Sequence, residues 1–342
     1  MSGGVDSSVS AALLKDQGYD VIGLTARMCS DEWTCHSDDF IDDARRAAEF
    51  LGIPHSVVDL HVPFKERVIR YFAEEYARGR TPSPCAVCNR YIKFGALREH
   101  AESLGANRLA TGHYARLKRD DDGSCHLLAG ADADKDQSYF LFDLSQEQLS
   151  RAIFPLGNMT KKEVKELARQ KGIPVARRGE SQDLCFVASG DHPRVVEELF
   201  PSVKKSGDMV DLSGKKVGRH SGLHRYTIGQ RRGLGIAAGR PVYVVKLDAD
   251  RNVVVVGEKK ALQGKTASLK GVRWTLGSAP PAPVIARTKI RYNHIGAESR
   301  VTPCGPHAAA VDFDEAQFAV TPGQIAVFYV GDELIGGGWI EN

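Results

Sequence analysis

The sequence lacks the features that would place the chain in a membrane or outside the cell. It contains no apolar run of about 18 residues, the length that a membrane-spanning helix needs. Its start, MSGGVDSS, has neither the basic region nor the apolar core of a secretory signal. Seven cysteines are an odd number and indicate reduced thiols in a cytoplasmic protein. We interpret Cys125 and Cys304 as buried structural thiols.

An excess of charge of either sign is also absent. The chain has 46 basic and 43 acidic residues and a formal net charge of +3, which does not by itself indicate a nucleic-acid partner. Its 342 residues predict two or three domains, because a single core rarely grows to that size. No long apolar seam is present, and we expect a monomer.

The first part of the chain alternates helix and strand patterns. Helical patterns cover residues 7–17, a stretch that ends at Leu51, and residues 64–78 and 91–104, and strand patterns cover residues 20–26, 55–60 and 108–113. This alternation predicts an α/β fold with a doubly wound parallel sheet and helices on both faces.

The remainder of the chain changes character twice. A mainly helical stretch contains a capping box formed by Thr160 and Glu163. From about Gly207 onward, short strands and glycine turns predict one or two small β-barrels. The expected units are residues 1–145, 146–204, 205–266 and 267–342.

A glycine- and serine-rich loop leads directly into the first helix. Its glycines let backbone N–H groups turn towards a phosphate, and the helix N-terminus adds a partial positive charge. No Gly-Lys-Ser or Gly-Lys-Thr follows, which excludes a Walker loop. The string SGGVDSS resembles the loop of the PP-loop ATP pyrophosphatases, which cleave ATP between the α- and β-phosphates. The resemblance implies a Mg²⁺-associated role for Asp6 and ATP contacts for Met1, Ser2, Gly3, Gly4, Val5, Asp6, Ser7 and Ser8.

In that superfamily the loop follows a parallel strand, whereas here it starts at Met1. We expect the first strand of the sheet to be missing from this sequence, through a misassigned start or a truncation. ATP affinity would then be weak, and a version of the chain extended upstream would bind ATP more tightly.

Two cysteine segments lie far apart in the chain. Cys85 and Cys88 end a proline-bracketed loop just ahead of a predicted helix, a position that lowers the pKa of a thiol. Cys185 lies in the string GESQDLCF. Three interpretations compete, namely a zinc site, thioredoxin-like redox chemistry and sulfur transfer through a persulfide. Cys185 has no CxxC partner, and the spacing of Cys29, Cys35 and His36 is not a strong zinc signature. An ATP loop is foreign to thioredoxin-like proteins, which favours sulfur transfer.

A series of strings in fixed order resembles the bacterial tRNA-specific 2-thiouridylase family over nearly the whole chain. The strings are PSPCAVCN, IKFG, ATGHYA, KDQSYFL, ESQDLCF and TIGQRRGLGI. The resemblance implies ATP-dependent 2-thiolation of the wobble uridine of tRNA through an adenylated base and a cysteine persulfide. By position, Cys88 resembles the nucleophile and Cys185 the persulfide carrier, while Gly112 and Ala26 resemble nucleotide contacts.

The resemblance also implies which residues meet the tRNA and which protein supplies the sulfur. Ser83, Pro84 and Cys85 resemble the segment that meets the target base. Some relatives have an aspartate at the position of Cys85, so an acid–base role there is open. Further tRNA contacts are implied for His113, Lys135, Asp136, Gln137, Arg291, Tyr292 and Gln324. The sulfur would come from a persulfide donor protein fed by a cysteine desulfurase.

Basic residues of the β region support an RNA partner. Arg287, Lys289 and Arg291 alternate and would share one face of a strand. A second cluster comprises Arg219, His220, His224, Arg225, Arg231 and Arg232. Both clusters are expected to contact phosphates.

Three alternatives remain open. An iron–sulfur cluster on Cys85, Cys88 and Cys185 would replace the persulfide mechanism. A PP-loop synthetase or amidotransferase would adenylate a small metabolite, and would leave Cys185 and the basic β region unexplained. A tRNA-binding protein without catalysis would leave the loop and the thiols unexplained.

Overall fold

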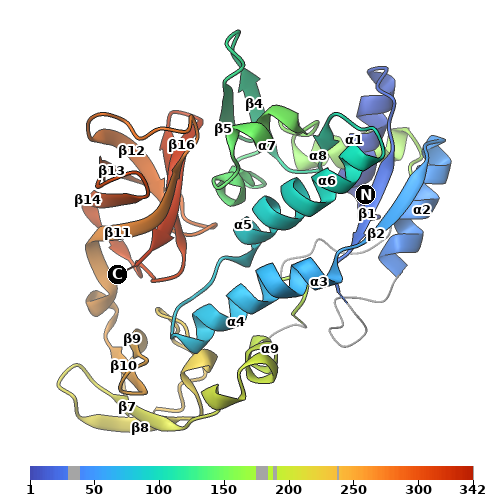
Figure 1. Cartoon of the computed structure of the whole chain (residues 1–342). Helices are drawn as coiled ribbons and strands as arrows, with labels where there is room; N and C mark the ends of the chain where they lie inside the picture. Colours follow the sequence, from blue (N-terminus) through green and yellow to red (C-terminus); the bar gives the residue numbers. More distant parts are fainter. Residues whose placement is uncertain (30–38, 175–183, 188–190, 237–238, 342) are drawn as a thin grey trace.

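The computed structural model describes residues 1–29, 39–174, 184–187, 191–236 and 239–341. An N-terminal α/β region, a small four-stranded sheet and a barrel follow one another along the chain (Figure 1). None of the described helices is long and apolar enough to span a bilayer.

The N-terminal region contains parallel strands, as predicted. β1 (Gly23–Arg27) pairs with β2 (His55–Asp59), and β3 (Leu109–Ala110) pairs with β6 (Ala152–Ile153), both in parallel. The helices around them and after them are α1 (Val5–Asp16), α2 (Asp39–Leu51), α3 (His61–Phe64), α4 (Arg70–Ala77), α5 (Pro84–Cys88), α6 (Leu97–Ser103), α7 (Gln146–Arg151), α8 (Lys161–Gln170) and α9 (His192–Leu199). The alternation of helix with parallel strand confirms the predicted α/β class.

Short π-helical and 3-10 segments complete these helices. The π-helical segments are η1 (Lys65–Ile69) and η2 (Asn89–Ala96). The 3-10 turns are η3 (Ser138–Leu141), η4 (Pro201–Val203), η5 (Leu223–Arg225) and η6 (Lys259–Leu262). The capping box at the start of α8 is confirmed, since Thr160 Oγ1 accepts from the backbone N–H of Glu163 and the Glu163 carboxylate accepts from that of Thr160.

The cysteine helix, which carries Cys85 and Cys88, begins earlier than the sequence predicts. α5, η2 and α6 follow one another without a break from Pro84. Proline suits the first helical position because its missing N–H costs no hydrogen bond there. Cys85 and Cys88 therefore lie inside the helix rather than ahead of it, next to a π-helical turn of the kind that often marks functional sites.

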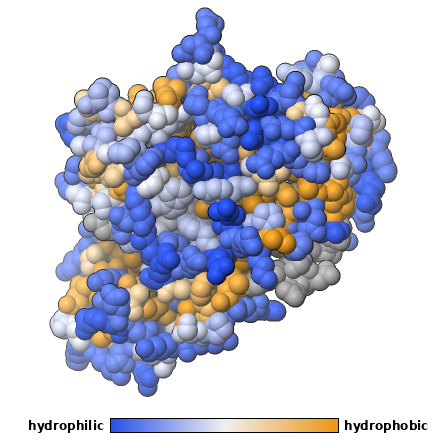
Figure 2. Space-filling model, in the orientation of Figure 1, coloured by the Kyte–Doolittle hydropathy of each residue, from blue (hydrophilic) through white to orange (hydrophobic). Residues whose placement is uncertain are grey.

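The small sheet has the strand order β8-β7-β10-β9. Its strands are β7 (Gly207–Val210), β8 (Lys216–His220), β9 (Tyr243–Asp248) and β10 (Val253–Gly257). β9 and β10 pair antiparallel around the predicted turn, with Asp248 opposite Val253. Figure 2 shows a hydrophobic patch over this part of the molecule, at the lower left.

The last strands close into a six-stranded barrel, which confirms the predicted C-terminal β-barrel. Its order is β11-β14-β13-β12-β15-β16, and β16 pairs back with β11. The strands are β11 (Gln263–Trp274), β12 (Val284–Lys289), β13 (Ala297–Pro303), β14 (Ala308–Phe318), β15 (Ile325–Val330) and β16 (Glu333–Ile340). Buried residues alternate along β11 to β14 and fill the barrel interior.

The barrel is joined to the N-terminal region by strand pairing and by buried charge. A hairpin of β4 (Ala115–Arg119) and β5 (Cys125–Ala129) adds to the barrel sheet at β16, a feature not predicted from the sequence (Figure 1). The Asp143 carboxylate is 2% exposed and accepts from Arg90 on the cysteine helix at 2.7 and 2.8 Å and from Arg273 on β11 at 3.0 Å. A buried carboxylate needs such partners, so these contacts fix the barrel against the cysteine helix.

Candidate active site

The glycine-rich loop is folded onto the N-terminus of α1. Gly3 has a φ of +71°, and a Cβ there would lie 2.5 Å from Cβ of Asp43, so only glycine fits. The hydroxyls of Ser7 and Ser8 donate to the carbonyl oxygen of Gly4 at 3.1 and 3.0 Å. The loop therefore presents its backbone at a helix N-terminus, the arrangement that binds anions.

The other residues expected at the nucleotide lie beside this loop. The Met1 carbonyl accepts from Thr25 Oγ1 at 2.8 Å, which places Met1 against β1. Ser2 Oγ is 3.2 Å from Ser7 Oγ. Ala26 follows Thr25 on β1 and is half-buried.

Asp6, in the first turn of α1, is held by two residues that the sequence did not single out. Lys161 Nζ donates to both carboxylate oxygens of Asp6 at 2.7 Å, and the Tyr114 hydroxyl donates to one of them at 2.9 Å. Lys161 stands 155 positions from Asp6 in the sequence, at the first position of α8. Nothing in its local pattern indicates this pairing.

A four-residue segment, Thr111 to Tyr114, connects the loop with the cysteine helix. A Cβ on Gly112 would lie 2.9 Å from Cβ of Asp6 and 3.1 Å from the backbone nitrogen of Ser7, so the loop packs directly on this glycine. The next residue, His113, lies 3.4 Å through Nε2 from Lys93 Nζ on η2. The segment thus touches the nucleotide loop with one residue and the cysteine helix with the next.

His113 is buried and acts as an acceptor for Lys93. Burial, with a smaller effect of the Lys93 charge, holds the pKa of His113 well below its usual value, so the ring is neutral. Lys93 donates to Nε2, and Nδ1, which then carries the proton, donates to Thr111 Oγ1 at 2.7 Å. These contacts fix the ammonium group of Lys93 next to the thiols.

Three thiols lie within the electrostatic influence of Lys93. Cys88 is 7% exposed, whereas the side chains of Cys85 and Cys185 are exposed. Cys88 interacts electrostatically with both other cysteines, and Lys93 interacts with all three. In a π-helical turn, residues five positions apart lie one above the other, which places Lys93 on the face of Cys88. The structure therefore brings together the two cysteine segments that the sequence separates.

The thiols are not activated as the sequence predicted. Burial raises the pKa of Cys88 to about 12, and Lys93 only partly opposes this effect. Surrounding protein also raises the pKa of Cys85, and that of Cys185 to about 11, although both side chains reach the surface. The expected lowering by a helix N-terminus is wrong because Cys88 lies at the end of α5 and is desolvated.

The raised pKa predicts how Cys88 reacts with an alkylating agent. Because the thiolate is the reactive form, its alkylation by iodoacetamide should accelerate about tenfold per pH unit between about pH 7 and 9, without a plateau. Lys93→Met should slow the reaction at every pH, because the ammonium group lowers the pKa of Cys88. Lys118→Met, on the exposed end of β4, is the matched control. Mass spectrometry of the peptide that contains Cys88 gives the rates, and a plateau below pH 9 would contradict the prediction.

Phe186 anchors the segment that carries Cys185. Its ring packs edge-on against Phe64 at 5.7 Å and Phe72 at 5.1 Å between centroids, in a buried cluster that also includes Cys88. Glu180 and Asp183 of the motif lie outside the described residues. The role of Phe186 as an anchor was not predicted from the sequence.

The expected tRNA contacts at 135–137 are partly internal. Asp136 is 8% exposed and accepts from the backbone N–H groups of Gly130 and Ser138, both at 3.0 Å. Gln137 Oε1 accepts from the backbone of Tyr114 at 3.2 Å. In this structure these two side chains shape the loop, and Lys135 is half-buried.

The expected contacts at 291 and 292 lie on the side of the barrel that faces the cysteine helix. The ring of Tyr292 stacks on Phe140, with 4.7 Å between centroids, and interacts electrostatically with Cys85. Arg291 donates to the carbonyl oxygen of Phe318 at 2.9 Å. The expectation that Arg287, Lys289 and Arg291 share one strand is wrong, because β12 ends at Lys289.

Gln324 lies on the turn before β15 and holds the proline-rich loop. Its Nε2 donates to the carbonyl oxygens of Thr81 and Pro82 at 3.3 and 3.2 Å. Next to it, the Pro322 carbonyl accepts from the backbone of Thr81 at 2.9 Å. The barrel thereby fixes the chain immediately before Ser83 and Pro84, which are both buried.

These contacts predict a positioning effect for Gln324. Gln324→Met keeps the volume and loses both hydrogen bonds, so kcat for tRNA thiolation should fall about tenfold with little change in KM. Gln263→Met, at an exposed position of the same barrel, should leave both constants unchanged. A rise in KM with an unchanged kcat would show that Gln324 acts only as a tRNA contact.

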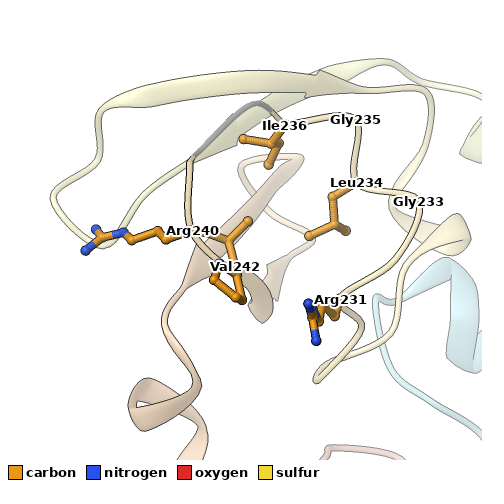
Figure 3. Close-up of a pocket in the computed structure, with 8 residues that line it drawn as sticks. Arg231, Gly233, Leu234, Gly235, Ile236, Arg240 and Val242 are labelled. Carbon is orange, nitrogen blue, oxygen red and sulfur yellow. The ribbon is translucent and has the colours of Figure 1, made fainter.

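Two other expectations from the sequence are wrong. His220 and His224 are 3% and 1% exposed, so their buried side chains do not contact phosphates as expected. Arg231 of the same basic cluster is exposed and lines a hollow of about 460 Å³ in the small β region (Figure 3). Cys304 is exposed rather than buried, whereas the burial of Cys125 is confirmed.

Comparison with known proteins agrees with this architecture. Residues 1–189 match a family model described as the tRNA methyl transferase HUP domain, residues 196–258 the tRNA methyl transferase PRC-barrel domain, and residues 265–340 the aminomethyltransferase beta-barrel domain. The fold and the site therefore define a tRNA-modifying transferase built on a HUP domain.

Named relatives narrow this class. The chain is 49% identical to the tRNA-specific 2-thiouridylase of Geobacter metallireducens, over 100% of this chain and 95% of the relative. It is 48% identical to the corresponding protein of Geotalea uraniireducens, over 100% and 94%. The chain belongs to the tRNA-specific 2-thiouridylase family. This confirms the resemblance and the sulfurtransferase interpretation, and it supports them over a small-metabolite synthetase.

Solved structures add only slight likenesses. A predicted subunit of tRNA methyltransferase from Methanocaldococcus jannaschii is 23% identical, with a TM-score of 0.30 over 49% of this chain and 72% of that one. The U34-tRNA thiolase from Methanococcus maripaludis with its 4Fe–4S cluster is 22% identical, with a TM-score of 0.34 over 59% and 65%. Neither carries a conclusion about this site.

Proposed function

We propose that this enzyme thiolates C2 of the wobble uridine of tRNA with Cys185 as the persulfide carrier and Cys88 as the attacking thiol. The observation that supports these roles best is the segment from Thr111 to Tyr114. It packs on the nucleotide loop through Gly112 and on Lys93 through His113. An adenylated base therefore has one place where it reaches both the loop and the thiols.

The proposed reaction has two stages. The uridine O2 attacks the α-phosphorus of ATP held at residues 1–8, and pyrophosphate leaves. The terminal sulfur of the Cys185 persulfide then attacks C2 and AMP leaves, after which Cys88 attacks Sγ of Cys185, breaks the S–S bond and leaves the sulfur on C2. Alternatively, Cys88 attacks the persulfide first and releases the sulfide that attacks C2 and displaces AMP. The by-product is a Cys88–Cys185 disulfide, which an external thiol must reduce in each cycle.

The residues present fit ATP better than they fit a metal cluster. The loop at the N-terminus of α1 suits phosphates, and Asp6 is the carboxylate there that would hold Mg²⁺ with ATP, although Lys161 bonds both of its oxygens in this structure. Among the residues that the structure describes, no three His, Cys, Asp or Glu side chains are grouped to hold a metal ion. Cys85, Cys88 and Cys185 as placed do not fit an iron–sulfur cluster.

Sulfur incorporation tests the proposed function. Purified enzyme, ATP, unmodified tRNA and a cysteine desulfurase with radioactive cysteine should give labelled tRNA, with AMP and pyrophosphate formed in step with the label. Omission of ATP or of tRNA should stop both products. ATP cleavage that continues without RNA would instead favour a synthetase acting on a small metabolite.

A further inference from the structure

Asn89 is buried beside the thiols, and only the NH₂ group of its side-chain amide is hydrogen-bonded to a described residue. It follows Cys88 directly and lies one helical turn after Cys85, which places it on the face of Cys85. Asn89 as a whole is 2% exposed. Nδ2 donates to the carbonyl oxygen of Phe140 at 3.0 Å, whereas no donor among the described residues bonds Oδ1.

The orientation of this amide is determined by its neighbour. A backbone carbonyl only accepts hydrogen bonds, so the NH₂ group and not the oxygen must face Phe140. Oδ1 is therefore a fixed acceptor in a place shielded from solvent. Buried acceptors without a partner are costly and rare in native proteins, and those that persist call for a functional reason.

The residues around Asn89 indicate the chemistry of the partner that Oδ1 would accept from. The ring of Phe140 stacks on Tyr292, and Tyr292 interacts electrostatically with Cys85, so Asn89 stands within this group of residues. Under the proposed function this group receives the target base. Uracil carries a donor, N3–H, directly next to the C2 carbonyl that reacts, whereas cytosine has a bare N3 acceptor.

We propose that Oδ1 of Asn89 accepts the N3–H of the target uracil and thereby selects uridine over cytidine. This inference rests on the proposed function and adds to it the group that reads the base. The same contact turns the neighbouring O2 towards the nucleotide loop, since O2 and N3–H lie on one edge of the ring. A water-excluded acceptor of this kind discriminates strongly against a base that lacks the donor.

Binding of two anticodon stem–loops tests the proposal. One carries uridine and the other 3-deazauridine, in which a C–H group replaces N3–H, at the target position. The wild-type enzyme should bind the uridine form about tenfold or more tightly, a preference worth about 1.4 kcal/mol. Asn89→Ala should bind both forms equally. Asn89→Asp keeps an acceptor but loses the donor to Phe140, and should retain a preference for uridine even if both affinities fall.

The ratio of the two affinities separates recognition from structure. Loss of the Phe140 contact weakens both stem–loops together and leaves their ratio unchanged. A wild-type ratio near one, or a ratio that survives in Asn89→Ala, overturns the proposal. Sulfur incorporation by the wild-type enzyme is measured in parallel. Labelled tRNA with a ratio near one removes only the role of Asn89, whereas an absence of labelled tRNA removes the proposed function itself.

Discussion

Serine in place of Cys185 is expected to reduce sulfur incorporation into tRNA by a factor on the order of 10⁴ or more, as when a residue that carries a covalent intermediate is removed. A hydroxyl cannot form a persulfide, so the transferable sulfur never reaches the site. Affinity for tRNA should stay nearly unchanged, because the Cys185 side chain is exposed and Phe186, not Cys185, anchors its segment. Pyrophosphate formation should continue at most to the level of one adenylated tRNA per enzyme, because AMP leaves only when sulfur reaches C2.

The structure supplies a matched control for this substitution. Cys304 is also free and exposed, but it lies on the loop after β13 in the barrel. Cys304→Ser should therefore retain full activity. Thiolation and tRNA affinity are measured on both variants by radioactive sulfur incorporation and by filter binding. Unchanged turnover in Cys185→Ser would remove the carrier role, and equal losses in both variants would indicate a general sensitivity to thiol replacement.

Local features of the site were predictable because they depend on neighbouring residues. The loop before α1, the capping box at α8 and the turn between β9 and β10 each follow from short strings that leave few backbone choices. The barrel followed from alternation and glycine turns for the same reason. Each of these predictions depended on residues that lie close together in the sequence.

Features that depend on distant contacts were not predictable. Lys161 meets Asp6 across 155 positions, and the β4–β5 hairpin finds its partner strand beyond residue 330. The pKa of Cys88 was expected to be lowered by its helix, but tertiary burial raises it. In each case a long-range contact decided the outcome. The sequence of one segment does not indicate which distant segment packs against it.

Alanine in place of Gly112 is expected to weaken ATP binding about 10- to 100-fold, because overpacking a close contact costs about 1–3 kcal/mol. The new Cβ would lie 2.9 Å from Cβ of Asp6 and 3.0 and 3.1 Å from backbone atoms of Asp6 and Ser7, and backbone cannot move aside as a flexible side chain can. The loop must therefore shift away from the segment that also positions His113 and Lys93. Thiolation should fall with the loss of ATP affinity, since both depend on the same segment.

Gly264→Ala in β11 is the matched control, because the nearest neighbour of the new Cβ would be 3.6 Å away, at an ordinary contact distance. Calorimetric titration with ATP gives the affinities, and the thermal unfolding midpoint shows whether either variant is generally destabilised. Equal ATP affinity in Gly112→Ala and the wild type would mean that the nucleotide does not depend on the contact between this glycine and the loop, and the arrangement proposed for adenylation would have to be abandoned.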